Sequence, residues 1–230
     1  MEVLVKIQNM YKHYPVGTGK FTALKNIDLE IKKGEFTGII GPSGSGKTTL
    51  LNVIGSLDVQ SEGSVNVLGR EVRSLSRKDS ARLRSSKIGF IFQTYNLLPV
   101  YTVYENVEFP LLLLKITAAK RKRMVLDALE WVGLMDKIKS RPAQLSGGEC
   151  QRVAIARAIV KKPCIVLADE PTANLDAENS HHILRTMVDL NKKLNTTFIF
   201  STHDAKVIQY LRRKITLIDG KVASDEIIRQ

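Results

Sequence analysis

The stretch GPSGSGKT, residues 41–48, decides the fold of this chain. It fits the pattern G-x-x-x-x-G-K-[ST] at every fixed position, and it lies between an apolar run at 36–40 and a segment of helical character at 47–57. Glycines let backbone N–H groups approach phosphate oxygens, and the following helix N-terminus adds the positive end of its dipole. In such a loop Lys47 reaches the β- and γ-phosphates and the Thr48 hydroxyl is a ligand of Mg²⁺. The stretch therefore predicts a strand, a loop and a helix that together bind a nucleotide.

Strand and helix patterns alternate around this loop. Alternating polar and apolar side chains predict half-buried antiparallel strands at 3–7, 27–31 and 63–68. Short apolar runs predict further strands at 36–40, 88–92, 165–168, 198–201 and 215–218. Helical patterns cover 79–86, 102–114, 118–132, 153–160 and 179–194.

The order of these segments predicts an α/β fold, in which a mostly parallel sheet is covered by helices. We expect an antiparallel β portion at the N-terminus and a helical lobe inserted into the sheet at residues 94–159. Residues 1–93 and 160–230 then form the core lobe. The whole chain, 1–230, is expected to be a single nucleotide-binding domain.

The apolar strand at 165–168 ends in two acids. Asp169 is placed to hold Mg²⁺ through water, and Glu170 is one residue further on, where a carboxylate can act as general base toward an attacking water. An apolar strand that ends in Asp-Glu is weak evidence by itself. Together with the phosphate loop it predicts a site that hydrolyses a nucleoside triphosphate.

The stretch LSGGE, residues 145–149, is followed by a helix at 150–160. A hydroxyl and exposed N–H groups at a helix N-terminus make a second anion site in the same chain. The alternative is that Ser146 is only a helix N-cap. The pattern Leu-Ser-Gly-Gly-x-x-x-Arg shortly before an acidic strand is specific enough to favour the anion site.

With these motifs the sequence resembles the ATP-binding subunits of ABC transporters over essentially its whole length. Residues 41–48 match the Walker A loop of that family, 145–149 its signature motif and 165–169 its Walker B strand. Gln93 matches the Q-loop glutamine, 174–176 the D-loop and His203 the switch histidine. The resemblance implies a P-loop NTPase fold of the RecA-like type, with ATP and Mg²⁺ as ligands and ATP hydrolysis as the reaction.

The resemblance also implies roles for individual residues. The implied catalytic residues are Glu170, His203, Gln93 and Lys47, and the implied metal ligands are Thr48, Gln93 and Asp169. The implied nucleotide-binding residues are Tyr14, Gly41, Ser43, Gly44, Ser45, Gly46, Lys47, Thr48, Thr49, Ser146, Gly148 and Asp176. Ser146 and Gly148 complete the site of a second copy of the chain, so two chains enclose two ATP molecules head to tail. Tyr14 stacks on adenine; Tyr11 is the competing choice, and either ring could instead belong to the core.

Three further stretches, 55–58, 83–93 and 96–99, resemble the ATPases of lipoprotein-releasing and macrolide-exporting systems. That branch usually has Gln-Gln-Gln-Arg after Ser-Gly-Gly, whereas this chain has ECQR at 149–152. The resemblance implies a motor whose closure drives a separate integral membrane permease, in export or in extrusion of a lipophilic substrate. An alternative is a regulatory ATPase of the cell-division or signalling type, which acts on a membrane complex without transport.

Composition limits the remaining function classes. The 230 residues are 43% hydrophobic and 25% charged, which is typical of a globular protein. No apolar run approaches the roughly 18 residues that span a bilayer, and the N-terminus lacks a secretory stretch, so we expect a peripheral protein at the cytoplasmic face of the cell membrane. The net charge of +12 permits a nucleic acid partner. DNA- and ribosome-associated ABC ATPases usually carry a coiled-coil insertion or a second cassette, so we expect no nucleic acid.

Residues 92–101, FQTYNLLPVY, are expected to form the docking surface for the membrane partner. Their aromatic and aliphatic side chains in a loop-like segment either bury into the helical lobe or form an exposed patch. In the resembling family this segment lines the cleft that receives a cytoplasmic helix of the membrane subunit. The helix dipole at Cys150 can lower the pKa of its thiol and make it reactive; the alternative is an inert thiol that only fills space. We expect Cys164, at the start of a buried strand, to react more slowly.

Overall fold

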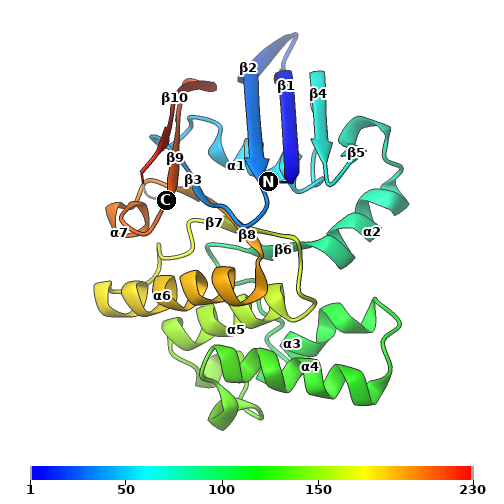
Figure 1. Cartoon of the computed structure of the whole chain (residues 1–230), viewed down its shortest axis with the longest axis vertical. Helices are drawn as coiled ribbons and strands as arrows, with labels where there is room; N and C mark the ends of the chain where they lie inside the picture. The colour runs from blue at the N-terminus through cyan, green and yellow to red at the C-terminus, as the bar shows by residue number, and fades with distance from the viewer. Residues whose placement is uncertain (1, 229–230) are drawn as a thin grey trace.

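The computed structural model describes residues 2–228, which form two β-sheets and the helices that cover them (Figure 1). The four-stranded antiparallel sheet has the order β2 (Gly19–Lys32), β1 (Val3–Val16), β4 (Glu62–Val67) and β5 (Arg70–Glu71). The six-stranded sheet has the order β10 (Lys221–Ile227), β9 (Arg213–Ile218), β3 (Phe36–Ile40), β8 (Thr197–Thr202), β7 (Ile165–Asp169) and β6 (Ile88–Ile91). Its strands are parallel except for β10. The predicted α/β fold with an N-terminal antiparallel portion is confirmed.

The helices lie on both sides of the six-stranded sheet. In chain order the α-helices of the described residues are α1 (Lys47–Ile54), α2 (Arg77–Lys87), α3 (Val103–Leu112), α4 (Ala118–Trp131), α5 (Gly147–Ile159), α6 (Ala177–Leu194) and α7 (Ala205–Ile208). Short 3₁₀ turns cover Val72–Ser74, Met135–Lys137 and Pro142–Gln144. Figure 1 shows α3 to α6 stacked below the sheet, while α1 lies above it with the antiparallel strands.

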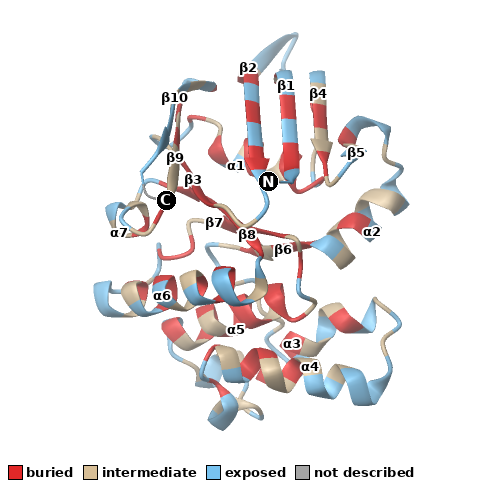
Figure 2. Ribbon diagram, in the orientation of Figure 1, coloured by how far each residue is buried: buried red, intermediate tan, exposed pale blue. Residues whose placement is uncertain are grey.

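Alternate side chains of the parallel strands enter two different apolar cores. Ile39, Leu167 and Ile199 point to the antiparallel sheet and α1, whereas Phe36 and Phe198 point to α5 and α6. This is the consequence of a period of two along strands that are covered on both faces. Figure 2 shows the same pattern, because the central strands are buried along their length while α4 and α6 are buried on one side only.

The division of the chain at residues 94–159 stays a prediction. Helices α3, α4 and α5 pack together, as a helical lobe requires, but α6 and the lower face of the sheet belong to the same apolar cluster. No helix among the described residues is long and apolar enough to cross a membrane.

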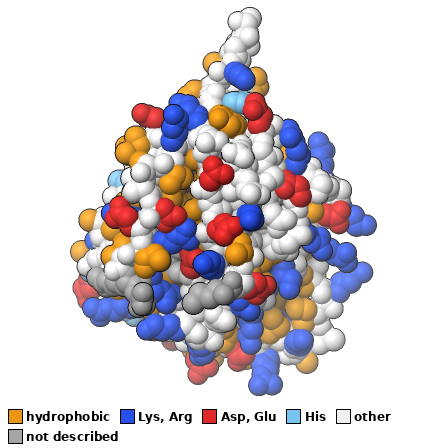
Figure 3. Space-filling model, turned by 45° about the horizontal axis from the view of Figure 1, so that its top comes forward, with side chains coloured by type: hydrophobic (Ala, Val, Ile, Leu, Met, Phe, Trp, Pro, Cys, Tyr) orange, Lys and Arg blue, Asp and Glu red, His pale blue; other side chains and the backbone are white. Residues whose placement is uncertain are grey.

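Strand β10 and the full length of the β1–β2 hairpin are absent from the sequence-based prediction. Its limits of 3–7 and 27–31 miss the outer part of the hairpin, which stands out from the body at the top of Figure 3. The outer residues are mainly polar or exposed, so they carry little apolar periodicity, and pairing alone keeps them extended. Helix α1 is also shorter than the predicted 47–57, because the chain leaves the helix at Gly55.

Candidate nucleotide-binding site

The phosphate loop follows the carboxyl end of β3 and enters α1 in a conformation that only glycine tolerates at two points. Gly41 has φ of 156°, and a Cβ there would lie 2.1 Å from the carbonyl oxygen of Leu217. Gly46, the N-cap of α1, has φ of 101° and faces the carbonyl oxygen of Ala23. No side chain caps α1, so its first N–H groups stay available for an anion.

Lys47 lies folded back over this loop. Its ammonium donates to the carbonyl oxygens of Gly41 at 2.8 Å and Pro42 at 3.0 Å. Among the described residues its partners are these backbone oxygens and not a carboxylate, although only 7% of the residue is exposed. The hydroxyl of Ser45 is buried beside it without a hydrogen-bond partner. Both groups are therefore held near the loop with bonding capacity left for phosphate oxygens.

Thr48 and Asp169 form the pair that fits a divalent cation. The Thr48 hydroxyl lies 3.2 Å and 3.1 Å from the two carboxylate oxygens of Asp169, so the first turn of α1 meets the end of β7. Hard oxygen donors of this kind suit Mg²⁺, which usually keeps several further ligands from water and phosphate. Across residues 2–228 no group of three or more His, Cys, Asp or Glu side chains makes a metal site of its own.

Gln93 lies just beyond β6, and its backbone oxygen accepts a hydrogen bond from the Asn174 side chain at 2.8 Å. Its own amide side chain is exposed and has no hydrogen bond within the described part of the chain. The structure therefore ties the 93 and 174 segments together, but it does not join the Gln93 side chain to Thr48 and Asp169.

Glu170 is held in an unusual backbone conformation. Its φ of 45° is in the left-handed region, which is rare for a residue with a side chain and recurs at functional sites. One carboxylate oxygen accepts from the Thr202 hydroxyl at 3.0 Å, and the other lies 2.6 Å from Nδ1 of His203. The ends of β7 and β8 thus bring together two residues that are 33 positions apart.

A cavity of about 300 Å³ lies between the β1–β2 hairpin and the start of α1. It is lined by Tyr14, Phe21, Ala23, Gly44, Gly46, Lys47, Thr48 and Thr49. Tyr11 is the strand partner of Glu62 on β4, and it does not line this cavity. Phe21 is absent from the sequence-based set of site residues, yet it is the cross-strand partner of Tyr14 and is 56% exposed. The sequence does not mark Phe21, because its exposure and its position opposite Tyr14 follow from the pairing of β1 with β2.

The signature loop packs against α6 and not against the phosphate loop of its own chain. Ser146 is the N-cap of α5: its hydroxyl accepts from the Glu149 N–H, and the Glu149 carboxylate accepts from the Ser146 N–H. A Cβ on Gly148 would lie 2.7 Å from the Asn179 amide oxygen. Asp176 is likewise the N-cap of α6 and holds Asn179. Each of these residues therefore has a local structural role, whatever it binds.

The segment at 92–101 is anchored by two side chains that sequence reasoning missed. The Arg157 guanidinium of α5 donates to the backbone oxygens of Tyr95 and Asn96 at 2.6 Å and 2.5 Å. The buried Asn106 amide bonds the backbone of Leu98 on both its N–H and its oxygen. Leu97 packs on the apolar core, whereas Val100 and Tyr101 are exposed.

The expectation of a lowered pKa at Cys150 is wrong, and the structure agrees with the alternative of a buried thiol that fills space. Burial raises the pKa of its thiol, and the neighbouring Glu149 carboxylate raises it further, so the helix dipole does not prevail. The thiol is buried and faces the Pro142 carbonyl oxygen at 3.7 Å. Cys164 is the more exposed of the two cysteines, so the burial on which its slower reaction was predicted is not found.

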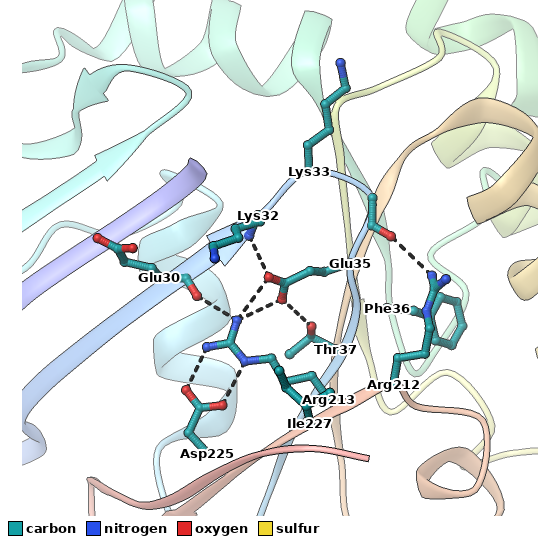
Figure 4. A pocket seen from close by; sticks show the side chains of 11 residues that line it. Glu30, Lys32, Lys33, Glu35, Phe36, Thr37, Arg212, Arg213, Asp225 and Ile227 are labelled. Atoms are coloured by element: carbon teal, nitrogen blue, oxygen red, sulfur yellow. Dashed lines mark hydrogen bonds and ion pairs between the residues drawn. The ribbon is translucent and has the colours of Figure 1, made fainter. Parts of the chain in front are cut away.

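A second cavity, of about 610 Å³, lies away from the phosphate loop, between the β2–β3 turn and the β9–β10 hairpin (Figure 4). Its charged groups mostly satisfy one another: Arg213 donates to Glu35 and to both oxygens of Asp225, and Arg212 lies over the Phe36 ring. These bonds hold the pKa of Arg213 above its ordinary value, led by the pair with Asp225. The ion pairs of Arg213 join the β2–β3 turn to the β9–β10 hairpin across this cavity, so its charged groups already have a structural role.

Comparisons with known proteins identify relatives of this chain. Residues 24–173 match the ABC transporter family. The chain is 43% identical over 225 residues to the lipoprotein-releasing system ATP-binding protein LolD of Pseudoalteromonas translucida, which spans 98% of this chain and 97% of that protein. It is 41% identical to an uncharacterized ABC transporter ATP-binding protein of Methanocaldococcus jannaschii, over 98% of each. A solved dimeric structure of that cassette, in a post-hydrolysis state bound to ADP and Pi, superposes with a TM-score of 0.90 over 99% of this chain and 100% of that one.

Proposed function

The chain belongs to the ABC transporter family as an ATP-hydrolysing, nucleotide-binding subunit, and from this premise we propose that two copies enclose two ATP molecules head to tail and drive a membrane-embedded partner. The relatives that release lipoproteins support a lipoprotein or another lipophilic molecule as the substrate of that complex. The chain then sits at the cytoplasmic face of the membrane, bound through its partner.

The separation of the phosphate loop from the signature loop within one chain is the observation that carries this proposal. The cavity beside Tyr14 is lined by the phosphate loop, and none of the described residues that line it comes from the signature loop. The N-terminus of α5, where Ser146 and Gly147 are exposed, is therefore left for the nucleotide of another copy. The dimeric form of the solved relative supports the same arrangement.

The residues of one chain divide the reaction among them. The Lys47 ammonium exchanges its two carbonyl partners for phosphate oxygens, and the free N–H groups of α1 cradle the phosphates. Thr48 and Asp169 hold Mg²⁺, which when bound supplies positive charge to the transferring phosphoryl group. Gln93 would become a further ligand of this Mg²⁺ once its exposed amide side chain turns toward Thr48 and Asp169.

Glu170 is the general base in this proposal. Its carboxylate orients the attacking water and accepts a proton from it, and its left-handed backbone fixes where the carboxylate points. The contact with His203 must loosen for this to happen, because His203 occupies one carboxylate oxygen and the Thr202 hydroxyl donates to the other, which leaves neither oxygen free for the water. His203, with a largely exposed side chain, is then free to contact the γ-phosphate.

Replacing Glu170 by Gln tests this proposal. We expect ATP binding to persist and hydrolysis to fall at least about 100-fold, because an amide cannot accept the proton. The variant should also form an ATP-dependent dimer in size-exclusion chromatography. The control is Glu178→Gln, at an exposed position in the first turn of α6. A Glu170→Gln variant that hydrolyses ATP near the wild-type rate would remove Glu170 from its proposed role.

The membrane partner is proposed to dock on residues 92–101. Arg157 and Asn106 fix the backbone of this segment, so its exposed side chains form a defined surface. We expect Leu98→Asp to leave the isolated chain folded and able to bind ATP but to weaken co-purification with the membrane subunit. The matched control is Val16→Asp, at an exposed apolar position on the β1–β2 hairpin. Equal co-purification of both variants would place the docking surface elsewhere.

A further inference from the structure

A largely buried ion pair lies behind the Tyr14 ring. The Lys12 ammonium lies 2.5 Å from one oxygen of the Asp58 carboxylate, and the Tyr14 hydroxyl donates to the other at 2.8 Å. The ammonium also donates to the Val59 carbonyl oxygen at 2.7 Å and lies 4.8 Å from the centre of the Tyr14 ring. Only 8% of Lys12 is exposed. The ring is therefore held at its hydroxyl and along its face by two residues that do not line the nucleotide cavity.

Asp58 is itself fixed to the end of α1. The N–H groups of Leu57 and Asp58 both donate to the Asn52 carbonyl oxygen, at 2.9 Å and 3.2 Å. The Asp58 carboxylate also accepts from the Val59 N–H at 2.7 Å. The other end of α1 is the phosphate loop. One eight-residue helix thus connects the group that holds Tyr14 with the groups that hold the phosphates.

We propose that Asp58, held by Lys12, is a positioning residue for adenine: it fixes the Tyr14 ring as one wall of the nucleotide cavity without touching the nucleotide. The inference rests on the proposed role of Tyr14 as the adenine-stacking residue. A ring fixed before binding does not have to be ordered when the base arrives, so less binding energy is lost. The distance between base site and phosphate site is then set by α1.

The charges of the network agree with this arrangement. Burial alone raises the pKa of Asp58, but the hydrogen bonds from Lys12 and Tyr14 outweigh it and hold that pKa below its ordinary value. Burial and the Asp58 carboxylate raise the pKa of the Tyr14 hydroxyl, which stays a donor at neutral pH. Asp58 therefore remains charged, and Tyr14 remains bonded to it, throughout the physiological range.

The experiment separates base binding from phosphate binding. Equilibrium affinities are measured for ATP and for inorganic tripolyphosphate, which has no base, on the wild-type chain and on Asp58→Ala, Tyr14→Phe, Tyr14→Ala and the Asp58→Ala/Tyr14→Phe double variant. We expect ATP affinity to fall about fivefold in Asp58→Ala and about threefold in Tyr14→Phe, within the range of one stacking contact. The double variant should lose no more than Asp58→Ala alone. Tripolyphosphate affinity should not change.

Glu62→Ala is the matched control. The Glu62 carboxylate of β4 lies within hydrogen-bond distance of His13, the residue before Tyr14 on β1, and its bond is to His13 and not to Tyr14. The control variant should bind ATP as the wild-type chain does. For ATP hydrolysis by Asp58→Ala, kcat should equal that of the wild-type chain, whereas the KM for ATP should rise. Asp58→Ala leaves Lys12 without its carboxylate, so Tyr14→Phe, which keeps the ion pair, provides the same test should Asp58→Ala fold poorly.

Two results would overturn the inference. A parallel loss of ATP and tripolyphosphate affinity would mean that Asp58 acts on the phosphate loop or on folding. Wild-type ATP affinity in both Asp58→Ala and Tyr14→Phe, with a loss in Tyr14→Ala, would mean that the ring needs no support. If Tyr14→Ala also binds ATP normally, the proposed adenine role of Tyr14 itself fails.

Discussion

Two glycine-rich helix N-termini of this molecule satisfy their backbone donors in opposite ways. At α1 the N-cap is Gly46 in a left-handed conformation, with no side-chain cap, and the buried Ser45 hydroxyl has no partner. At α5 the N-cap is Ser146, which forms a complete capping box with Glu149, and Lys137 lies 3.3 Å from the Glu149 carboxylate. The first helix end is left open, whereas the second is closed by its own side chains.

The difference indicates what each end requires from a ligand. The open end of α1 needs a bound anion to satisfy its donors, so changes there should act on nucleotide binding. The closed end of α5 is stable without a ligand, so changes there should act first on folding and then on whatever meets its outer face.

Lys47→Ala should give the largest effect on binding. The loss of a charge-assisted contact to phosphate should weaken ATP affinity by about 100-fold, at roughly 1.5–3 kcal/mol for each hydrogen bond to a charged group. The matched control is Lys137→Ala, which removes a cation from the other helix end and should leave ATP affinity within about twofold. Titration of each chain with a fluorescent ATP analogue measures both. Equal losses would mean that both ends bind the nucleotide of the same chain.

Exchange of one glycine for alanine at each end should separate backbone strain from local crowding. Gly46→Ala forces a φ of 101° on a side chain and places a Cβ 2.8 Å from a backbone oxygen, so we expect a loss of about 2 kcal/mol in stability. Gly148→Ala meets the end of the Asn179 side chain, which can move, so its loss should stay below about 1 kcal/mol. Thermal unfolding should show the larger Tm decrease for Gly46→Ala. The reverse order would show that Asn179 is as rigid as backbone.

Ser146→Ala should affect folding more than nucleotide binding by a single chain. Removing the N-cap hydroxyl should cost about 1 kcal/mol, a Tm decrease of roughly 2–4 °C for a chain of this size. ATP affinity of the monomer should not change. Mixing Ser146→Arg chains with Lys47→Ala chains adds a test of the dimer: one composite site collects both lesions and the other neither, so partial ATPase activity should return. Confirmed mixed dimers with no activity would argue against sites shared between copies.

The cap of α5 should weaken in acid. The Ser146 N–H, together with Lys137, holds the pKa of Glu149 below its ordinary value of 4.5. A carboxylate with a depressed pKa contributes stability that is present above its unfolded pKa and is lost as the pH falls through its folded pKa. The effect of Glu149→Gln on Tm should therefore be largest near neutral pH and shrink below about pH 4.5. A difference that grows in acid would contradict this sign.

The two cysteines should show the smallest effect. Because burial raises the pKa of Cys150 and Cys164 is more exposed, iodoacetamide should modify Cys164 several-fold faster at pH 8. Single Cys→Ser variants assign each rate by mass spectrometry. Faster modification of Cys150 would mean that the α5 end opens in solution. Denatured protein, in which both thiols should react alike, is the control.

The motifs of this site could be read from the sequence because each is a local requirement. Gly41 and Gly46 lie where a Cβ would strike a backbone oxygen, and Lys47 follows from the same loop, so residue type and spacing fix the phosphate loop. The strands and helices can be predicted from the spacing of apolar residues. A period of 2 indicates a strand buried on one face, a continuous apolar run a strand buried on both faces, and a period of 3.6 a helix. These features predicted the α/β fold and the order of its elements.

The contacts that complete the site were decided by the tertiary structure. Thr48 meets Asp169 across 121 positions, His203 meets Glu170 across 33, and Tyr14 meets Asp58 across 44. Arg157 holds Tyr95 across 62. The number of residues between two side chains does not fix their distance when they lie on different strands and helices. The contacts of Asp58 and Arg157 could therefore not be predicted from the sequence.

Cys150 is a residue whose position in its helix follows from the sequence but whose surroundings follow only from the tertiary structure. Its position four residues after the Ser146 N-cap can be read from the sequence, and the helix dipole at that position favours a thiolate. Whether the thiol faces water or the interior depends on what packs over the helix, here the chain around Pro142. Desolvation of a charge outweighs the partial charge of a helix end, so burial decides its pKa. The sequence alone determined the local backbone and its motifs, and the packing of distant segments decided the environment of each functional group.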